Sequence, residues 1–341
     1  MGEYQMGYYD FPSTVAAFQN VTAPSNFIIA YSVLFSLPIP VNKKNCGVFT
    51  TNKLKTYQVG AACPLYKDEG PVTPIELPEL KGFIPKNFCV GPKHAGMLTV
   101  NGSIYLWGAN EVGQLGNGDE SPSRRPTKVA GDTKFSQLVC AEKATLAIAE
   151  NGEVHQWGQL NPRSDEKYST PHNCGFKADN IGAGQYHAVA TKYIHRKGVG
   201  FSRCFTWGLG ADGRLGHGNE DDIPCNKAKK LKFDVSDSAT STRSTAVIDE
   251  SSQLRVFGRN YGNLKVNHGP KILTPTVVEE LGEDLETVRA DWADDIYLTD
   301  NEDDVQVLLG DRITYDDPEA DKEGTPSKGS PPKVVEIRMP S

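Results

Sequence analysis

Five glycines fall within residues 207–218, WGLGADGRLGHG, and three of them have the spacing of a dinucleotide-binding loop. Gly208, Gly210 and Gly213 satisfy the pattern G-x-G-x-x-G, and a β-prone run, 204–207, precedes them. In dinucleotide-binding enzymes such glycines let the backbone approach a pyrophosphate at the N-terminus of a helix. The pattern has this meaning only inside a strand–loop–helix unit, so the surrounding elements must decide it.

Three side chains of the kind that bind metals, His172, Cys174 and His187, lie close together in the sequence. Imidazole and thiolate groups are common ligands of Zn²⁺. However, the seven cysteines include no Cys-x-x-Cys pair, and the chain has no His-Glu-x-x-His, Gly-x-Ser-x-Gly or P-loop motif. We therefore expect these side chains to have packing roles, and we predict neither a metal site nor a catalytic residue.

The elements that must position these groups are short strands. Apolar runs separated by Gly, Pro, Asn and Asp recur along most of the 341 residues, and helical periodicity is scarce. The most apolar run, 27–37, is too short to cross a bilayer, and no Lys or Arg precedes it as in a signal peptide. The odd number of cysteines, several in apolar segments, favours a reducing compartment. We expect an all-β, intracellular protein of the cytoplasm, the nucleus or both, without membrane insertion.

Glycines that end a β-prone run recur at intervals of 53, 48, 50, 50, 50 and 52 residues. They are Gly7, Gly60, Gly108, Gly158, Gly208, Gly258 and Gly310. The residues before them form an apolar ladder: Met6, Val59, Trp107, Trp157, Trp207, Phe257 and Leu309. An apolar column at every repeat is typical of a core, and a period near fifty residues predicts the four-stranded blades of a β-propeller.

Upstream of several ladder glycines, a second β-run ends in a turn signal. Asn101-Gly102, Asn151-Gly152 and Ser251-Ser252 each lie between two β-runs. Asn-Gly is typical of a type I′ turn, in which both central residues need a positive φ. Each repeat is therefore predicted to contain an antiparallel hairpin and an outer strand. In the repeat that ends at Gly208, the segment 193–203, YIHRKGVGFSR, replaces the short turn by a basic protrusion.

Two of the repeats resemble those of the regulator of chromosome condensation family. Residues 94–129, HAGMLTVNGSIYLWGANEVGQLGNGDESPSRRPTKV, and 207–224, WGLGADGRLGHGNEDDIP, are similar to its signature W-G-x-N-x-x-G-Q-L-G-x-G. Its Gly-x-x-His start occurs at 91–94 and 184–187, while the equivalent places hold Ala141/Ala144 and Ala290/Ala293, so this chain is identified as a divergent member. The resemblance implies a seven-bladed β-propeller that occupies residues 1–341 as one domain.

The repeat alignment also decides the first question. The G-L-G-A-D-G of 208–213 corresponds to G-A-N-E-V-G at 108–113, and a phosphate cradle would not recur with the blades. We therefore interpret the glycines as turn formers and predict no bound cofactor. The histidines of the two Gly-x-x-His segments, His94 and His187, are expected to hydrogen-bond between neighbouring strands.

The two ends of the chain indicate how the ring closes. Residues 332–337 resemble the segment that opens a repeat, as 126–129 does, and residues 3–7 resemble one that ends it. N-terminal and C-terminal strands are therefore predicted to complete the seventh blade together. The polar segment 316–333 is expected to form a flexible loop.

Charge is unevenly distributed along the chain. Residues 279–323 contain eighteen Asp and Glu and three Lys and Arg, a net −15 against −7 for the whole chain, so the remainder carries +8. An acidic sector can steer a basic partner, or it can simply keep a repeat protein soluble. Protruding loops on rigid scaffolds often bind partners. The candidate partner-binding residues are Asp300, Glu302, Asp303, Asp304, Asp316 and Asp317 in the acidic sector, and His195, Arg196, Lys197 and Arg203 in the protrusion.

Two functions stay open at this point. The first is a non-catalytic scaffold that binds proteins, including a basic protein surface at the acidic sector. The second is implied by the family resemblance alone: nucleotide exchange on a small GTPase such as Ran, with a hairpin wedged against the GTPase. A conventional enzyme is disfavoured because no convergent polar residues can be assigned. Direct nucleic-acid binding is not expected, since the chain has no long basic arm.

Overall fold

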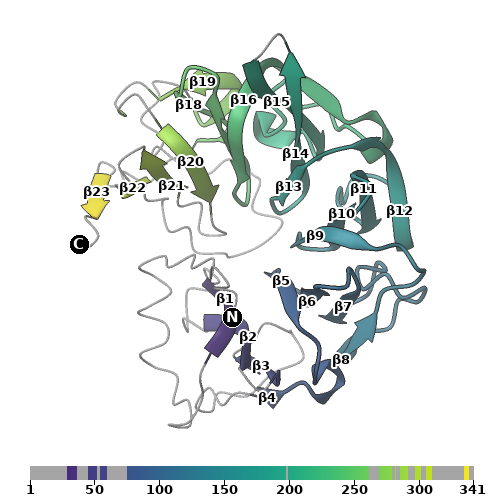
Figure 1. The fold of residues 1–341 in the computed structure, drawn as a ribbon. Coiled ribbons are helices and arrows are strands. Elements are labelled where there is room, and N and C mark those ends of the chain that lie inside the picture. The colour runs from purple at the N-terminus through teal and green to yellow at the C-terminus, as the bar shows by residue number, and fades with distance from the viewer. Residues whose placement is uncertain are drawn as a thin grey trace.

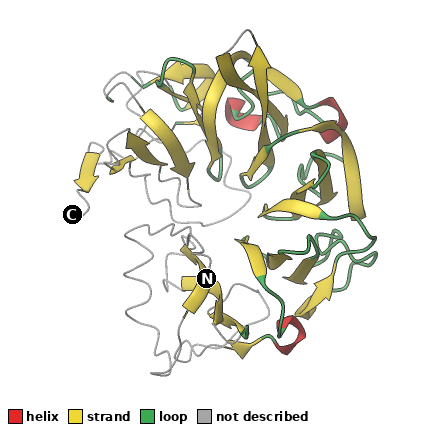
Figure 2. Cartoon of the chain, viewed as in Figure 1, coloured by secondary structure: helices red, strands yellow, loops and turns green. Residues whose placement is uncertain are grey.

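The protein is all-β, as predicted, and its strands form blades around a common centre (Figures 1 and 2). A computed structural model describes residues 29–36, 45–51, 54–59, 75–196, 199–260, 269–278, 281, 285–290, 296–300, 305–308 and 334–337. In these ranges the helices are the single 3₁₀ turns η1 (Pro78–Leu80), η2 (Ala211–Gly213) and η3 (Cys225–Lys227). None of the described helices is long and apolar enough to cross a membrane.

The first three blades are separate antiparallel sheets of four strands in chain order. The first blade contains β1 (Ile29–Ser36), β2 (Asn45–Thr51), β3 (Thr56–Val59) and β4 (Ile75–Glu76). The second contains β5 (Pro85–Val90), β6 (His94–Thr99), β7 (Ile104–Gly108) and β8 (Ser123–Lys128). The third contains β9 (Phe135–Cys140), β10 (Ala144–Ala149), β11 (Glu153–Gly158) and β12 (Tyr168–Lys177).

The fourth and fifth blades share one sheet, because the long strand β16 (Lys229–Thr240) belongs to both. Its first half is the outer strand of the fourth blade and pairs with β15, and its second half is the first strand of the fifth and pairs with β17. The other strands of this sheet are β13 (Asn180–Ala183), β14 (His187–Arg196), β15 (Val199–Gly208), β17 (Ser244–Asp249), β18 (Leu254–Arg259) and β19 (Lys271–Val277). The sixth blade contains β20 (Leu285–Ala290), β21 (Ile296–Asp300), β22 (Val305–Leu308) and β23 (Val334–Ile337).

The blades follow one another around the ring, with β5, β9, β13 and β20 facing the centre in Figure 1. At the C-terminal end, β23 pairs with β22 as an outer strand, the position that β8 holds in the second blade. The predicted N-terminal partner of the seventh blade, residues 3–7, lies outside the described residues, as does the segment 316–333.

The aromatic members of the ladder form the centre of the core. Trp107, Trp157 and Phe257 are each 0% exposed and Trp207 is 1% exposed. Met6, Leu309 and the side chain of Val59 lie outside the described residues. Burial of a large aromatic side chain at each of these four equivalent positions is a large apolar contribution to the second, third, fourth and fifth blades.

Each glycine-rich loop approaches the aromatic side chain of the next blade. A Cβ on Gly116, at φ +65°, would lie 2.6 Å from Nε1 of Trp157, and one on Gly216, at φ +75°, would lie 2.9 Å from the Phe257 ring. Only glycine fits both this backbone conformation and this contact. The G-Q-L-G and G-R-L-G turns therefore cover the ladder residue of the following blade.

The hairpin turns differ from the predicted type I′ geometry. Gly102 N donates to Thr99 O at 3.0 Å, and Gly152 N donates to Ala149 O at 2.8 Å. Among the central residues only the second has a positive φ, 77° at Gly102 and 86° at Gly152, and no positive φ occurs at either asparagine. The prediction of a type I′ turn was wrong because the loop is one residue longer, which leaves one left-handed position after an ordinary turn.

Two cysteines join neighbouring blades. Cys89 on β5 and Cys140 on β9 form a disulfide with a Cα–Cα distance of 5.6 Å and a sequence separation of 51 residues. The number and placement of the cysteines favoured a reducing compartment, in which thiols stay free. The disulfide was not predicted because a spacing of one whole repeat is not a recognisable motif, whereas closure of the ring brings the first strands of adjacent blades side by side.

The effect of close approach at the ladder glycines is separable from the effect of a positive φ. We predict that Gly158→Ala lowers the free energy of unfolding by about 1–3 kcal/mol more than Gly175→Ala. Both have a positive φ, 75° and 80°, but a Cβ on Gly158 would lie 2.3 Å from Lys143 O, whereas nothing lies within 4 Å of one on Gly175. Chemical denaturation of the two variants measures the difference, and equal losses would contradict the role of the close backbone contact.

Candidate functional site

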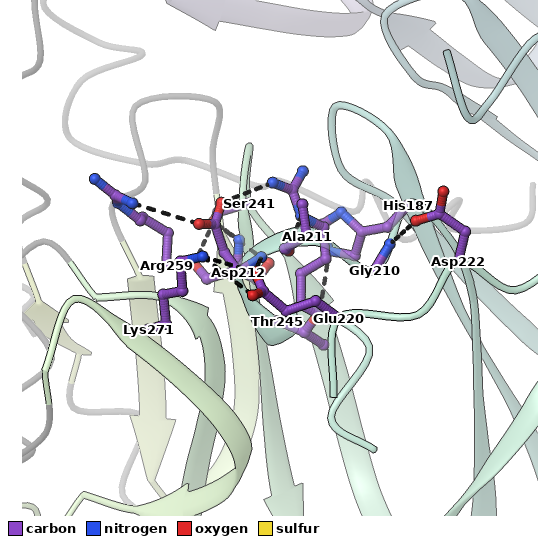
Figure 3. Close-up of polar contacts among 12 residues, drawn as sticks. His187, Gly210, Ala211, Asp212, Glu220, Asp222, Ser241, Thr245, Arg259 and Lys271 are labelled. Atoms are coloured by element: carbon purple, nitrogen blue, oxygen red, sulfur yellow. Dashed lines mark hydrogen bonds and ion pairs between the residues drawn. The ribbon is translucent and has the colours of Figure 1, made fainter. Parts of the chain in front are cut away.

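The loop 209–222 after β15 contains a buried ion-pair network (Figure 3). Asp212 is 8% exposed and Arg214 is 3% exposed, and the Asp212 carboxylate accepts a hydrogen bond from Arg214 Nη2 at 3.0 Å. The other carboxylate oxygen lies 3.4 Å from Nη1 of Arg259 on β18. A carboxylate between two guanidinium groups is well compensated for its burial.

A second ion pair attaches the same loop to the fifth blade. Lys271 Nζ, at the start of β19, donates to Glu220 Oε1 at 2.8 Å, and this oxygen also accepts from Asp212 N at 2.6 Å. These hydrogen bonds, that from Lys271 foremost, lower the pKa of Glu220. The network therefore holds the loop on the neighbouring blade.

The glycines of the dinucleotide-like pattern have the role predicted for turn formers. A Cβ on Gly210 would lie 2.0 Å from Asp221 O, and one on Gly213 would lie 2.6 Å from Leu273 Cα. Protein backbone, from the loop itself and from β19, therefore lies where a side chain at either glycine would be.

The two repeat histidines bond to the next blade. His94 Nε2 lies 2.8 Å from Thr145 Oγ1, and that hydroxyl donates to Gln114 O at 2.8 Å. The same series of hydrogen bonds joins the fourth blade to the fifth. There His187 Nε2 lies 3.0 Å from Thr245 Oγ1, and that hydroxyl donates to Arg214 O at 2.9 Å. The expected hydrogen bonds of the histidines thus run between blades and reach the glycine-rich loops.

The residue pairs at the start of the second strands alternate to make this possible. The second and fourth blades have His-Ala at 94–95 and 187–188, whereas the third and fifth have Ala-Thr at 144–145 and Ser-Thr at 244–245. Each histidine therefore hydrogen-bonds to a threonine of the next blade. In that next blade, the position equivalent to the histidine holds a small residue, alanine or serine. Ala144, one of the alanines at the equivalent of the family's Gly-x-x-His start, is the small residue of this arrangement in the third blade.

Burial keeps both histidines neutral. His94 and His187 are 0% exposed, and desolvation lowers the pKa of His94 to about 3 and that of His187 well below its ordinary value of 6.5, the latter with help from the Arg214 charge. A buried histidine that is fixed by one threonine fits a structural hydrogen bond rather than proton transfer.

The three candidate zinc ligands do not converge. His187 bonds to Thr245, His172 stacks on Tyr168 with ring centroids 4.0 Å apart, and the buried Cys174 belongs to the core cluster between the third and fourth blades. Within the described ranges no group of three His, Cys, Asp or Glu side chains is placed to hold a metal ion.

A pocket of about 370 Å³ opens between the third and fourth blades. The third repeat lacks the G-Q-L-G-x-G turn, since Gly158 is followed by Gln159, Leu160 and Asn161 and β12 begins at residue 168. No glycine turn therefore covers Trp207 as Gly116 covers Trp157. The residues that line the pocket are Gln156, Leu160, Asn161, Arg163, Ser164, Glu166, Trp207, Gly208, Asp222, Ile223, Pro224 and Cys225. The pocket was not predicted, although the missing G-Q-L-G-x-G turn of the third repeat is its signal in the sequence.

The basic protrusion is an extended hairpin of the fourth blade. Strands β14 and β15 pair over ten residues, from His187↔Gly208 to Arg196↔Val199, whereas the hairpins of the second, third and fifth blades pair over five. Tyr193 is 55% exposed and His195 is exposed. The backbone of Arg196 belongs to β14, while its side chain and Lys197 lie outside the described residues.

Strand pairing brings a second basic cluster to the base of this hairpin. Arg203 is opposite Asp234 and Thr206 is opposite Lys229 on β16. The side chains of Lys227, Lys229, Lys230 and Lys232 are exposed, and Lys230 forms an ion pair with Asp234 at 3.4 Å. The structure therefore places the candidate residue Arg203 beside a lysine-rich outer strand, at the base of the hairpin whose tip carries His195.

The acidic candidates cannot be added to this surface. Asp300 is the last residue of β21, in the sixth blade, and its side chain is not described. Glu302, Asp303, Asp304, Asp316 and Asp317 lie outside the described residues. Their role as a site for a basic partner stays a prediction.

Comparison with known proteins agrees with the repeat architecture. Residues 101–148 and 202–248 match the family model for the regulator of chromosome condensation (RCC1) repeat. The chain is 26% identical over 219 residues to the ultraviolet-B receptor UVR8 of Arabidopsis thaliana, which covers 60% of this chain and 48% of the receptor. It is 30% identical over 148 residues to the human E3 ubiquitin-protein ligase HERC2, covering 40% of this chain and 3% of the ligase. The chain thus spans less than half the length of either relative.

Solved structures with the same fold cover most of the chain. Human WBSCR16 has a TM-score of 0.62 at 17% sequence identity and covers 83% of this chain and 76% of its own. Prp20p of Saccharomyces cerevisiae has a TM-score of 0.61 at 17% identity and covers 82% of this chain and 71% of its own. These likenesses confirm the predicted propeller fold.

The buried histidines make stability depend on pH. The unfolded chain takes up a proton at each histidine below a pH of about 6.5, whereas the native state does so only near or below the lowered pKa, about 3 for His94. The contribution of each neutral histidine to the free energy of unfolding is therefore fully present well above a pH of about 6.5. This free energy falls by roughly 1 kcal/mol per histidine as the pH drops from about 6.5 to about 5.5.

His187→Gln should remove the share of this pH dependence that comes from one histidine. Denaturation at several pH values measures it, with His195→Gln, at an exposed position, as the matched control. If both variants keep the slope of the unaltered chain, His187 is not neutral and buried as described.

Proposed function

The chain is a divergent protein of RCC1 repeats folded as a β-propeller, and from this premise we propose that it is a non-catalytic scaffold that binds other proteins. The observation that carries the proposal is the hairpin of β14 and β15, which is twice as long as those of the neighbouring described blades. No described side chains form a catalytic group around it. Fold alone does not decide function, so the proposal depends on this surface.

The hairpin extension contributes little to the core but is firmly supported. Tyr193 at 55% exposure places a large side chain in water, where it adds little to folding. The base is held by pairing of Ser202 with Val235 and of Arg203 with Asp234. Asp179 accepts from Tyr193 N at 2.7 Å and forms an ion pair with Lys192 at 2.6 Å. A pre-ordered hairpin loses little entropy on binding, which favours recognition.

The charge of this surface favours an acidic protein partner. His195 and Lys229 are exposed, and Lys227 and Lys232 add two further exposed ammonium groups along η3 and β16. Complementary charge speeds association and fixes orientation. Lysines also protect a free sheet edge from self-association, and that role is compatible with binding a specific partner. The acidic sector at 300–317 is proposed as a separate site for a basic protein surface.

A charge reversal at the hairpin tip tests the scaffold. We predict that the triple variant His195→Glu, Arg196→Glu, Lys197→Glu captures its partner proteins in amounts at least about tenfold lower than the unaltered chain does. The reason is that like charges would face an acidic surface. The matched control is Arg124→Glu, Arg125→Glu, Lys128→Glu on β8, where all three side chains are exposed, and it changes the same number of positions on another blade. Quantitative mass spectrometry after affinity capture from cell extract compares the two. Equal retention of every partner would refute the hairpin as the binding surface.

A second candidate function is nucleotide exchange on a small GTPase. The observation in its favour is again the projecting hairpin, together with the fold of Prp20p, a yeast protein whose structure was described with its binding properties to Gsp1p and histones. At 17% identity the likeness extends to the fold alone, so this activity rests on analogy.

Release of labelled GDP from a panel of small GTPases, Ran included, tests this second function. An exchange factor should accelerate release from at least one member, and the hairpin-tip triple variant should abolish the effect while the β8 variant keeps it. No acceleration across the panel would eliminate exchange and leave the scaffold proposal standing.

A further inference from the structure

Two buried thiols meet at the boundary between the third and fourth blades. Cys174 lies on β12, the outer strand of the third blade, and Cys225 begins η3, in the loop of the fourth. Both belong to one core cluster, each is 1% exposed, and each thiol shifts the pKa of the other. They are separated by 51 residues, so only the folded ring brings them together.

Cys225 lines a pocket, whereas the other described free cysteines, Cys174 and Cys204, do not line it. It lines the pocket of about 370 Å³ that the shortened third repeat leaves open above Trp207. Cys204, by contrast, is 0% exposed on β15 within the core cluster of the fourth and fifth blades. A cavity of this size admits small molecules, so a reactant can approach the Cys225 sulfur without unfolding of a blade.

The contact makes the two thiols unequal. The hydrogen bond from Cys174 lowers the pKa of Cys225, against desolvation and the nearby Glu166 charge, which act in the opposite direction. The same contact, together with burial, raises the pKa of Cys174, and burial raises the pKa of Cys204. Because Cys225 lines the pocket and Cys174 does not, a reactant reaches Cys225 first, which makes Cys225 the nucleophile and Cys174 the resolving thiol.

We propose that Cys174 and Cys225 form an oxidation site that reacts with small hydroperoxides to give an interblade disulfide. The Cys225 sulfur attacks a peroxide oxygen, the O–O bond breaks, and Cys225 becomes a sulfenic acid while hydroxide leaves and is protonated to water. The Cys174 sulfur then attacks the Cys225 sulfur, the S–O bond breaks, and a second water leaves. The dithiol loses two electrons and two protons, and one hydrogen peroxide is reduced to two waters.

This site is distinct from the proposed binding hairpin and does not depend on that proposal. It lies on the opposite side of the third blade from the Cys89–Cys140 disulfide, which joins the first strands of the second and third blades. With both pairs oxidised, the third blade would be linked covalently to each neighbour. The oxidised form should also cap the pocket wall by fixing η3 to β12.

The three relevant cysteines fall in separate tryptic peptides, which makes the test direct. Cys174 lies in 168–177, Cys204 in 204–214 and Cys225 in 215–227. After treatment of the reduced full chain with one equivalent of hydrogen peroxide, mass spectrometry should find peptides 168–177 and 215–227 joined by a disulfide. Peptide 204–214 should keep its free thiol and serves as the internal control.

Variants identify the order of the two steps. In Cys174→Ser, the sulfenic acid on Cys225 has no resolving partner and should be trapped by a cyclic dione such as dimedone. In Cys225→Ser, Cys174 should stay reduced. Thermal denaturation of each variant checks that it is folded, and the experiment on the unaltered chain tests the proposal even where a variant does not fold.

Three outcomes would overturn the proposal. One is oxidation of Cys204 at the same rate as Cys225, which would show that the pocket gives no selective access. Another is a sulfenic acid on Cys225 of the unaltered chain that never cross-links to Cys174. The third is the absence of any peroxide product on peptide 215–227.

Discussion

The propeller depends on the close approach of one blade's glycine loop to the aromatic side chain of the next. Gly116 lies against Trp157 and Gly216 against Phe257, at distances that leave no space for a Cβ atom. These contacts cover ladder side chains that a single blade could not bury by itself. As in other repeat proteins, stability is therefore largely a property of the interfaces between neighbours.

The polar contacts between blades follow from this apolar contact. Once the loop is seated, its carbonyl oxygens at Gln114 and Arg214 need partners in a dry interface, and the threonine hydroxyls of the next blade supply them. The histidines in turn satisfy the threonines. The Asp212 and Glu220 ion pairs attach the rest of the fourth-blade loop to the fifth blade at its edge, where partial exposure makes charged contacts affordable.

The proposed reactive and binding sites lie where a repeat departs from this pattern. The third repeat has lost its covering turn, and the result is a pocket with Cys225 in its wall. The fourth repeat has a hairpin of ten residue pairs where its neighbours have five, and a lysine-rich strand beside it. The regular segments of a blade make the contacts that hold the ring together, whereas the irregular segments offer surfaces that a partner or a reactant can contact.

The sequence by itself determined the β class, the period near fifty residues, the ladder of Trp107, Trp157, Trp207 and Phe257, and the protruding hairpin. These features are local or strictly repeated, so spacing and side-chain type are enough to reveal them. The tertiary structure decided which blade each side chain meets: the His94–Thr145 and His187–Thr245 bonds, the Cys89–Cys140 and Cys174–Cys225 pairs, and the grouping of Arg203 with the β16 lysines. Each of these joins residues about one repeat apart or on separately predicted strands. A linear pattern carries no information about such pairs, because closure and twist of the ring set the facing partners.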